Sequence, residues 1–307
     1  MVKMKVNLGG IEMKNPVTTA SGTFGFGREY HHLVPVYQLG AVTVKGLTLE
    51  PRLGNRGVRL WETSSGVLNC IGLQNPGVDY FIAHILPWLR EQGAQVIANI
   101  SGNTIEEYQR MAQKFTGLAG IGGLEVNVSC PNVKAGGMAF GTDPEQTHRV
   151  IVAVAGNTDL PVLAKLSPNV TDIVAIAKAA EAGGAHGLAM INTLLGMAID
   201  INKQQPILGN VMGGLSGPAV KPVALRAVWQ VAQQTELPIL GMGGITTWED
   251  GVEFLLAGAT AIAVGTGNFV NPRATLEIIA GIEKYCIERG IQDVNELRGL
   301  AWKKKGE

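Results

Sequence analysis

Residues 162–191 read VLAKLSPNVTDIVAIAKAAEAGGAHGLAMI, and this stretch contains the repeating unit that decides the fold. It begins with the apolar run Val162–Leu166, continues through the amphipathic stretch Thr171–Ala182 and ends with a second apolar run, Gly187–Ile191. A short run that is apolar throughout, rather than at alternate positions, is typical of a parallel strand buried on both faces. Threonine is a common helix N-cap. The stretch therefore predicts a strand, a crossover helix and a second parallel strand.

The same alternation recurs along the whole chain. Eight apolar runs are predicted to be strands: Val17–Ala20, Ala41–Val44, Val96–Ile100, Leu124–Val128, Val162–Leu166, Gly187–Ile191, Ile239–Met242 and Ala261–Val264. Six stretches are predicted to be helices: Thr104–Phe115, Asp143–Ala155, Thr171–Ala182, Ala219–Gln234, Thr247–Leu256 and Pro272–Arg289. A hairpin around Gly9 and Gly10 is expected to precede them, between Lys5 and Val17.

Eight parallel strands with crossover helices imply an α/β fold, a closed eight-stranded (β/α) barrel of the TIM type with an N-terminal β-hairpin. An open doubly wound sheet is the competing architecture, but eight units without a clear mid-chain break favour closure. We therefore expect residues 1–307 to form a single domain. Connections 46–93 and 194–218 are unusually long and follow strand ends. We expect them to fold as long loops over the C-terminal face, where barrels carry their chemistry.

Composition excludes several classes of protein. The chain has 307 residues, 46% hydrophobic and 16% charged, and its 41 glycines follow no three-residue period, which excludes disorder and a collagen-like fold. Its 25 basic and 25 acidic side chains balance, so no net field attracts nucleic acid. The sequence has neither a long apolar run nor a signal peptide, so we expect a cytoplasmic protein without a membrane partner.

Polar or glycine residues follow all eight predicted strands. They are Ser21, Lys45, Asn99, Asn127, Lys165, Asn192, Gly243 with Gly244, and Gly265 with Thr266. Serine, asparagine and glycine also end strands simply as turn formers. A lysine at the end of a buried strand is costly unless an anion or an acceptor meets it. Lys45 and Lys165 therefore indicate an electron-rich ligand in the mouth of the barrel.

Two glycine-rich turns follow the seventh and eighth predicted strands, in Gly241–Ile245 and Val264–Asn268. Barrels of this type commonly bind phosphate there through backbone amides. Gly217 is expected to approach the same ligand. Together with the two lysines, the turns predict a phosphate-bearing cofactor. The five histidines lie away from the strand ends, so no metal site is expected.

Three cysteines are too few and too scattered for a disulfide framework, for zinc or for an ordinary iron–sulfur cluster. Cys130, in the segment NVSCPN after the fourth strand, is interpreted as a working thiol whose thiolate acts as base or nucleophile. The glycine-containing segment Val133–Thr142 after it resembles a hinged lid. Cys70 lies in the segment NCIGLQN, whose asparagines and backbone amides suit a planar polar substrate, and is expected to pack. Cys286 is expected to be structural.

These motifs, in this order, resemble those of the class 1 dihydroorotate dehydrogenases. The matching segments are Thr19–Gly22, Val44–Gly46, Asn69–Asn75, Asn127–Asn132, Ala164–Pro168, Ile191–Thr193 and Gly241–Ile245, and the resemblance covers essentially the whole chain. It implies an eight-stranded barrel with one FMN per chain. It also implies oxidation of dihydroorotate to orotate in pyrimidine (UMP) biosynthesis.

The resemblance also assigns roles to residues. Cys130 would remove a proton from C5 while a hydride leaves C6 for flavin N5, and Lys165 would stabilise the reduced flavin near its N1 and O2. The implied substrate-binding residues are Lys45, Asn69, Cys70, Ile71, Gly72, Leu73, Asn127, Asn192 and Thr193. The implied FMN-binding residues are Ser21, Lys45, Gly46, Asn99, Asn127, Lys165, Ile191, Gly217, Gly243, Gly244, Gly265 and Thr266.

The segment Lys134–Asp143 resembles the NAD-linked class 1B branch more than the fumarate-using homodimers. The quinone-using branch is excluded because it has an N-terminal extension and a serine base. The 1B branch implies a partner subunit with FAD and a [2Fe–2S] cluster, and a heterotetramer around two catalytic chains. Two alternatives from other classes are a flavin-free lyase, which would be colourless and use Lys165 or Lys45 as a Schiff base, and a non-catalytic binding barrel.

Overall fold

The computed structural model describes residues 2–129 and 140–303. Its centre is an eight-stranded parallel sheet in the order β3-β16-β15-β10-β9-β8-β7-β4. The strands are β3 (Val17–Thr19), β4 (Val42–Thr43), β7 (Val96–Ile100), β8 (Ile121–Asn127), β9 (Val162–Leu166), β10 (Gly187–Met190), β15 (Ile239–Met242) and β16 (Ala261–Val264). All eight predicted strands are therefore present.

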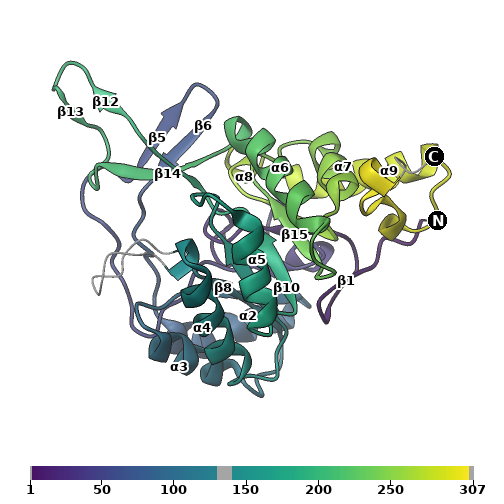
Figure 1. Cartoon of the computed structure of the whole chain (residues 1–307), viewed down its shortest axis with the longest axis horizontal. Helices are drawn as coiled ribbons and strands as arrows, with labels where there is room; N and C mark the ends of the chain where they lie inside the picture. The colour runs from purple at the N-terminus through teal and green to yellow at the C-terminus, as the bar shows by residue number, and fades with distance from the viewer. Residues whose placement is uncertain (1, 130–139, 304–307) are drawn as a thin grey trace.

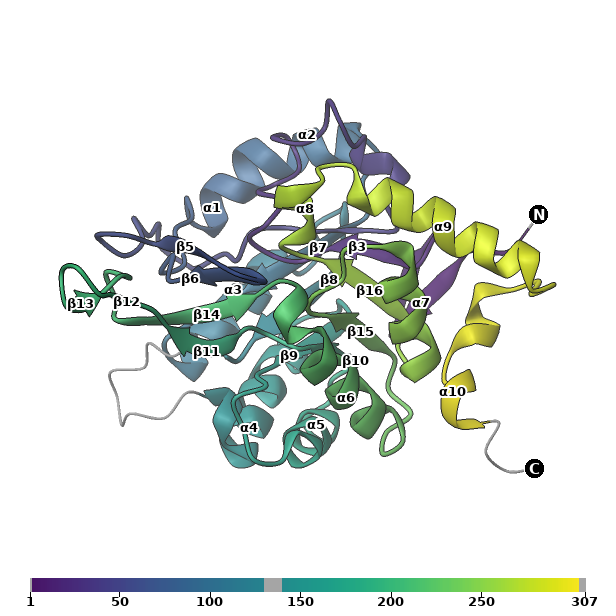
Figure 2. The ribbon, with the colours of Figure 1, turned by 90° about the horizontal axis from the view of Figure 1, so that it is seen from above.

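The sheet curls until its two edge strands meet. Thr18 Oγ1 on β3 lies 3.3 Å from Thr43 Oγ1 on β4, and Thr19 Oγ1 donates to the Thr43 carbonyl at the same distance. These contacts join the ends of the strand order into a nearly closed barrel. In Figure 2 the strands lie at the centre and helices surround them. The predicted TIM-type barrel is confirmed.

The six predicted helices are found within a few residues of their expected bounds. They are α3 (Ile105–Phe115), α4 (Pro144–Ala155), α5 (Ile173–Ala182), α6 (Lys221–Ala232), α7 (Trp248–Ala257) and α9 (Ala274–Glu288). The side chains of Thr104, Asp143, Asp172 and Thr247 cap four of them. Their apolar faces pack on the barrel, and they form one buried core with the strands.

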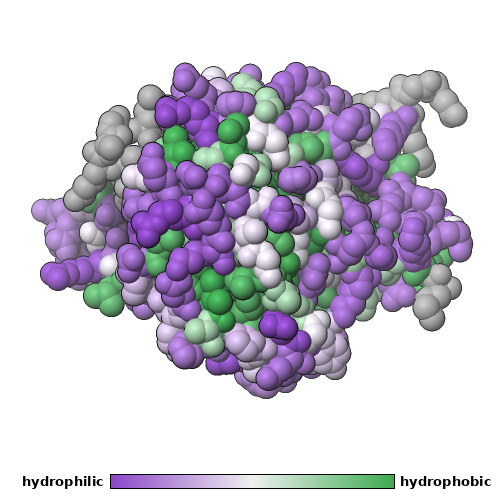
Figure 3. Space-filling view, turned by 90° about the horizontal axis from the view of Figure 1, so that it is seen from below, coloured by the Kyte–Doolittle hydropathy of each residue, from purple (hydrophilic) through white to green (hydrophobic). Residues whose placement is uncertain are grey.

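Shorter elements complete the described chain. They are η1 (Val36–Gln38), α1 (Val78–Tyr80), the π-helical turn η2 (Phe81–Ile85), α2 (Leu86–Glu91), η3 (Phe140–Thr142), η4 (Pro218–Val220), α8 (Gly267–Val270), η5 (Val294–Leu297) and α10 (Leu300–Lys303). The run α1-η2-α2 is the crossover between β4 and β7. It lies inside the connection 46–93, which was expected to be a long loop. Within the described ranges no helix is long and apolar enough to cross a membrane, and hydrophilic residues predominate on the face in Figure 3.

The N-terminal hairpin is confirmed and lies against the amino-terminal end of the barrel. It pairs β1 (Val6–Leu8) with β2 (Ile11–Met13). At the turn, a Cβ on Gly9 would lie 2.1 Å from the carbonyl oxygen of His186, just before β10, so only glycine permits this approach. The hairpin therefore covers the end opposite to the strand ends that were predicted to carry the site.

The two long connections are not simple loops, which corrects the expectation. They supply β5 (Leu60–Thr63) and β6 (Gly66–Asn69), and β11 (Leu194–Met197), β12 (Ile199–Asp200), β13 (Gln205–Pro206) and β14 (Met212–Ser216). Four of these form one antiparallel sheet in the order β11-β14-β6-β5. Figures 1 and 2 show this sheet and the β12-β13 hairpin projecting from the barrel, on the side opposite the two termini.

Candidate active site at the carboxyl ends of the strands

A buried cluster of polar side chains fills the carboxyl-terminal end of the barrel. Lys165 on β9 donates from Nζ to Glu125 Oε1 at 3.0 Å and to Ser21 Oγ at 3.1 Å. Asn99 on β7 donates to the same Glu125 oxygen at 2.6 Å. These residues come from β7, β8, β9 and the end of β3, so the barrel itself brings them together. Three of them were predicted from the sequence, and Glu125 was not.

Lys45, which follows β4, lies beside this cluster. Its Nζ would be 3.3 Å from a Cβ placed on Gly22. Burial lowers the pKa of the Lys45 ammonium, and the positive charges of Arg59 and Lys165 lower it further. A cation in this position gains stability when an anion approaches it. The two predicted lysines therefore lie close together, and Lys45 is suited to an anionic ligand.

Asn127, Asn192 and Thr193 form a second polar group beside the first. Asn192 Nδ2 donates to Asn127 Oδ1 at 3.1 Å, and the Thr193 backbone amide donates to Asn192 Oδ1 at 2.8 Å. Asn127 ends β8, opposite Lys165 in the register of β8 and β9. The amides are thus oriented by each other and by the backbone. Such fixed donors and acceptors suit a planar polar ligand.

The segment from Asn69 to Leu73 reaches this group from the projecting sheet. Asn69 ends β6 and donates from Nδ2 to the Gly214 carbonyl at 3.2 Å. Gly72 and Leu73 have positive φ, +77° and +53°, and the Leu73 side chain would lie 3.6 Å from a Cβ on Gly46. This part of the segment therefore lies over the turn that follows Lys45.

The Cys70 side chain packs, as expected. Its side chain is buried in a small cluster with Leu68 and Leu208, and its thiol donates to the Val58 carbonyl at 3.5 Å. Cys286 on α9 is fully buried in the main core. Cys130 and most of the expected lid lie outside the described residues. Of the lid, the structure describes the short turn η3 and the Asp143 cap of α4.

Glycines form a cradle at the ends of β14, β15 and β16. Gly217, Gly243 and Gly244 all have positive φ, +99°, +125° and +75°. A Cβ on Gly244 would lie 2.9 Å from the Gly217 carbonyl oxygen, so these two turns meet. Thr266 Oγ1 donates to Ser216 Oγ at 2.7 Å, which brings the end of β16 to the same place. The residues predicted to hold a phosphate therefore converge, and the close approach of Gly217 and Lys221 requires glycine at position 244.

Asp250 anchors the helix that follows this cradle. It accepts hydrogen bonds from Lys221 Nζ at 2.7 Å and from the amides of Thr246 and Thr247 at 2.8 and 3.0 Å. Burial alone would raise the pKa of the Asp250 carboxyl, but these hydrogen bonds outweigh it, so its pKa lies below the ordinary value. The charged carboxylate therefore stabilises the folded state.

We expect Asp250→Asn to lower the free energy of unfolding by about 1 kcal/mol at pH 7, because it removes the charge that pairs with Lys221. The folded-state pKa is depressed, so the contribution is complete above about pH 5 and is lost as the pH falls below about 4. Urea unfolding between pH 3 and pH 8 measures it. Glu249→Gln, an exposed change on the same helix, is the control. If the difference in unfolding free energy between Asp250→Asn and the native protein did not shrink in acid, the stabilising role of the Asp250 charge would be contradicted.

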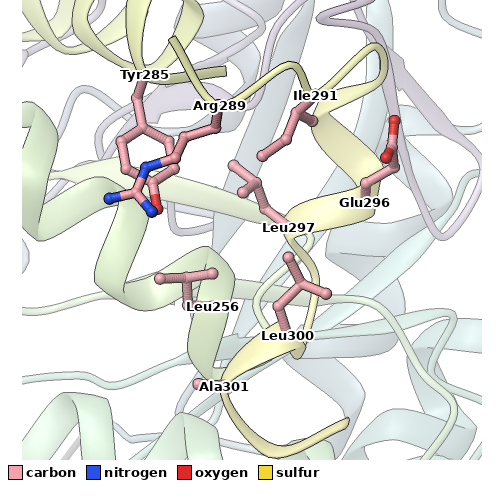
Figure 4. A pocket seen from close by; sticks show the side chains of 8 residues that line it. All are labelled: Leu256, Tyr285, Arg289, Ile291, Glu296, Leu297, Leu300 and Ala301. Atoms are coloured by element: carbon pink, nitrogen blue, oxygen red, sulfur yellow. The ribbon is translucent and has the colours of Figure 1, made fainter. Parts of the chain in front are cut away.

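A separate hollow lies between α7, α9, η5 and α10 (Figure 4), elements that Figure 2 shows near the termini and away from the projecting sheet. Its volume is about 530 Å³, and leucine side chains, Ile291 and the stacked pair Tyr285 and Arg289 line it. None of the predicted site residues lines it. Among the described residues no group of three or more histidine, cysteine or acidic side chains is placed to hold a metal ion. The polar end of the barrel is therefore the candidate site.

Comparison with known proteins shows which proteins the chain is similar to. Residues 3–286 match the family model described as dihydroorotate dehydrogenase. The chain is 60% identical to the dihydroorotate dehydrogenase B (NAD(+)), catalytic subunit, of Desulforamulus reducens, over 98% of this chain and 99% of that protein. Proteins of the same name from Alkaliphilus metalliredigens and Desulforudis audaxviator are 59% and 56% identical, over 97% and 99% of this chain and 98% and 99% of those proteins.

Proposed function

This chain belongs to the dihydroorotate dehydrogenase family, and we propose that the polar end of its barrel binds FMN and oxidises dihydroorotate to orotate in pyrimidine biosynthesis. The observation that carries the proposal is the convergence of three parts at one end of the barrel. They are the glycine cradle, the lysines Lys45 and Lys165, and the paired amides of Asn127 and Asn192. The glycine cradle suits a phosphate, the lysines suit an electron-rich ring, and the paired amides suit a planar polar substrate.

The residues present fit FMN. Backbone amides of the glycine cradle, with Thr266, would hold the phosphate, because the turns after β14, β15 and β16 converge there. Lys165 would lie at the N1 and O2 side of the ring. The other residues toward the ring would be Ser21, Lys45, Gly46, Asn99, Asn127 and Ile191. When bound, FMN supplies the two-electron acceptor for the oxidation.

The chain's own side chains would hold the substrate and move its proton. Asn69, Asn127, Asn192 and Thr193 would bind the pyrimidine by hydrogen bonds, with Ile71, Gly72 and Leu73 covering it. The Lys45 ammonium would attract the substrate carboxylate. The negative charge of that carboxylate would favour the protonated form of Lys45, which burial disfavours. Cys130, as thiolate, would take the proton from C5.

We further propose that electrons pass to NAD through a partner subunit in the cytoplasm. The relatives are named NAD-linked catalytic subunits, and the partner would carry FAD and a [2Fe–2S] cluster, with two catalytic chains at the centre of a heterotetramer. An exposed apolar hollow of about 680 Å³ supports this, because Leu60, Trp61, Phe269 and Val270 line it beside Thr266 of the cradle. A docked redox partner would thereby come close to the flavin.

Neither alternative from another class is favoured. The flavin-free lyase is not favoured, because residues 3–286 match the dihydroorotate dehydrogenase family and the relatives carry that name over nearly the whole chain. A binding barrel would not need the buried charges at the mouth. The fumarate-using branch is not favoured either, because the relatives share the NAD-linked name over nearly the whole chain.

We expect the purified chain to be yellow, to contain one FMN and to lose its colour when dihydroorotate is added without air. Gly244→Val should abolish retention of FMN, because the new side chain meets the Gly217 carbonyl and the Lys221 backbone. Gly93→Val, at a turn where a Cβ meets nothing within 4 Å, is the control for a left-handed glycine. A folded, colourless native protein that takes up no added FMN would overturn the proposed function.

A further inference from the structure

Glu125 is a buried carboxylate to which the proposed function gives no task. Its side chain is 0% exposed, and that of its partner Lys165 is 6% exposed. Removing two charges from water is expensive, and apolar residues of similar size usually serve stability as well as a buried ion pair does. Stability alone therefore does not explain a fully buried glutamate in β8.

The position of the Lys165 ammonium depends on its hydrogen bond to Glu125. Oε1 of Glu125 accepts from Asn99 Nδ2 at 2.6 Å and from Lys165 Nζ at 3.0 Å, while Oε2 has no partner among the described residues. An ammonium has three donors, and in the described structure Glu125 and Ser21 engage two of them. The remaining donor direction of Lys165 is fixed by these two bonds and is left for a ligand.

We propose that Glu125 is a positioning residue, which aims the Lys165 ammonium at the flavin and offsets part of its charge, and so limits how strongly the site prefers reduced over oxidised FMN. The inference rests on the proposed function, in which Lys165 lies at the N1 and O2 side of the ring. It adds a residue that acts on FMN through another side chain.

The charge balance explains why such a limit is useful. Uptake of two electrons and one proton gives the flavin one more negative charge, which the Lys165 cation stabilises. A cation without a counter-charge would hold the reduced flavin tightly and slow the departure of its electrons. Because Glu125 contributes a negative charge 3.0 Å from Nζ, the site can favour both the arrival and the departure of electrons.

The test is the reduction potential of FMN bound to the full chain, measured by reductive titration against a reference dye. Glu125→Gln keeps the size and an acceptor oxygen but removes the charge. In this variant we expect the ratio of the affinities for reduced and oxidised FMN to be at least about tenfold higher than in the native protein. A tenfold rise in this ratio shifts the reduction potential by about 30 mV in the positive direction. Glu125→Asp, which keeps the charge, should have an FMN reduction potential close to that of the native protein.

Glu181→Gln is the matched control, because its carboxylate accepts from Thr235 at the amino-terminal side of the barrel. It should leave the potential at the native value. If Glu125→Gln has the native potential, or a more negative one, the inference is overturned while a yellow native chain still supports the proposed function. A native chain without FMN would overturn both.

A second comparison remains decisive if Glu125→Gln does not fold. Lys165→Met leaves the carboxylate without its cation, and Lys165→Met with Glu125→Leu removes both charges, which buried pairs often tolerate. We expect the double variant to have a more positive FMN potential than Lys165→Met alone, because the negative charge beside the flavin is gone. Equal potentials would show that Glu125 has no influence on the flavin.

Discussion

Cys130→Ala is expected to slow the reduction of bound FMN by dihydroorotate about 10²–10⁴-fold, the usual cost of losing a general base. Binding of FMN and of orotate should persist, because the substitution removes the proposed base and changes none of the residues proposed to hold the cofactor and the pyrimidine. Stopped-flow flavin reduction measures the rate, and titration with orotate measures the affinity. The rate should fall while the affinity remains.

The pH dependence gives an independent check of the same residue. An unperturbed thiol has a pKa of about 8.5, and only its thiolate accepts the proton. Native flavin reduction should therefore accelerate as the pH rises toward the thiol pKa, and Cys130→Ala should lack this rise. Cys286→Ala, which removes a thiol from the core of α9, is the control. A Cys130→Ala protein with the native rate would remove Cys130 from the mechanism.

The barrel could be predicted from the sequence because its signal is local. The buried parallel strands are short runs of mainly apolar residues, and the crossover helices have helical periodicity, four of them with a side-chain N-cap. The ends of the strands then identified Lys45, Lys165, Asn127 and Asn192, since all parallel strands of a barrel end at one face. The structure brings these residues together as that rule requires.

The projecting sheet could not be predicted, because its pairing is not local. β6 pairs with β14, and Asn69 lies opposite Gly214, 145 residues further along the chain. Its strands are partly exposed and carry mixed residues such as Leu60–Thr63, so neither alternation nor a continuous apolar run marks them. The length of the two connections was the available signal, and it indicated their position over the mouth but not their structure.

Glu125 was missed for a different reason. The predicted site residues are those that end the strands, whereas Glu125 lies two positions before the end of β8 and faces Asn99 across the strand pair. A charged residue inside an otherwise apolar run was the signal that could have found it, since a buried carboxylate must have a partner. That partner, Lys165, was already among the predicted residues.

The purified chain without its partner is expected to reduce artificial dyes with dihydroorotate but not NAD. It contains three cysteines, fewer than the four thiolates that usually hold an iron–sulfur cluster, and the described structure shows one barrel with no second dinucleotide-binding unit. Substrate bound against the flavin would also exclude NAD from that face. NAD reduction should therefore appear only when the proposed iron–sulfur flavoprotein partner is added, as steady-state assays of both acceptors can measure.

The apolar hollow beside Thr266 makes this prediction specific. Val270 is 84% exposed at its edge, so Val270→Asp should preserve the fold and dye reduction but weaken the NAD activity of the mixture. Ile287→Asp, an exposed apolar position on α9, should leave both activities unchanged. A chain that alone reduced NAD as fast as it reduces dyes, or that passed electrons efficiently to fumarate, would instead belong with the homodimeric enzymes, since the flavin would then need no relay.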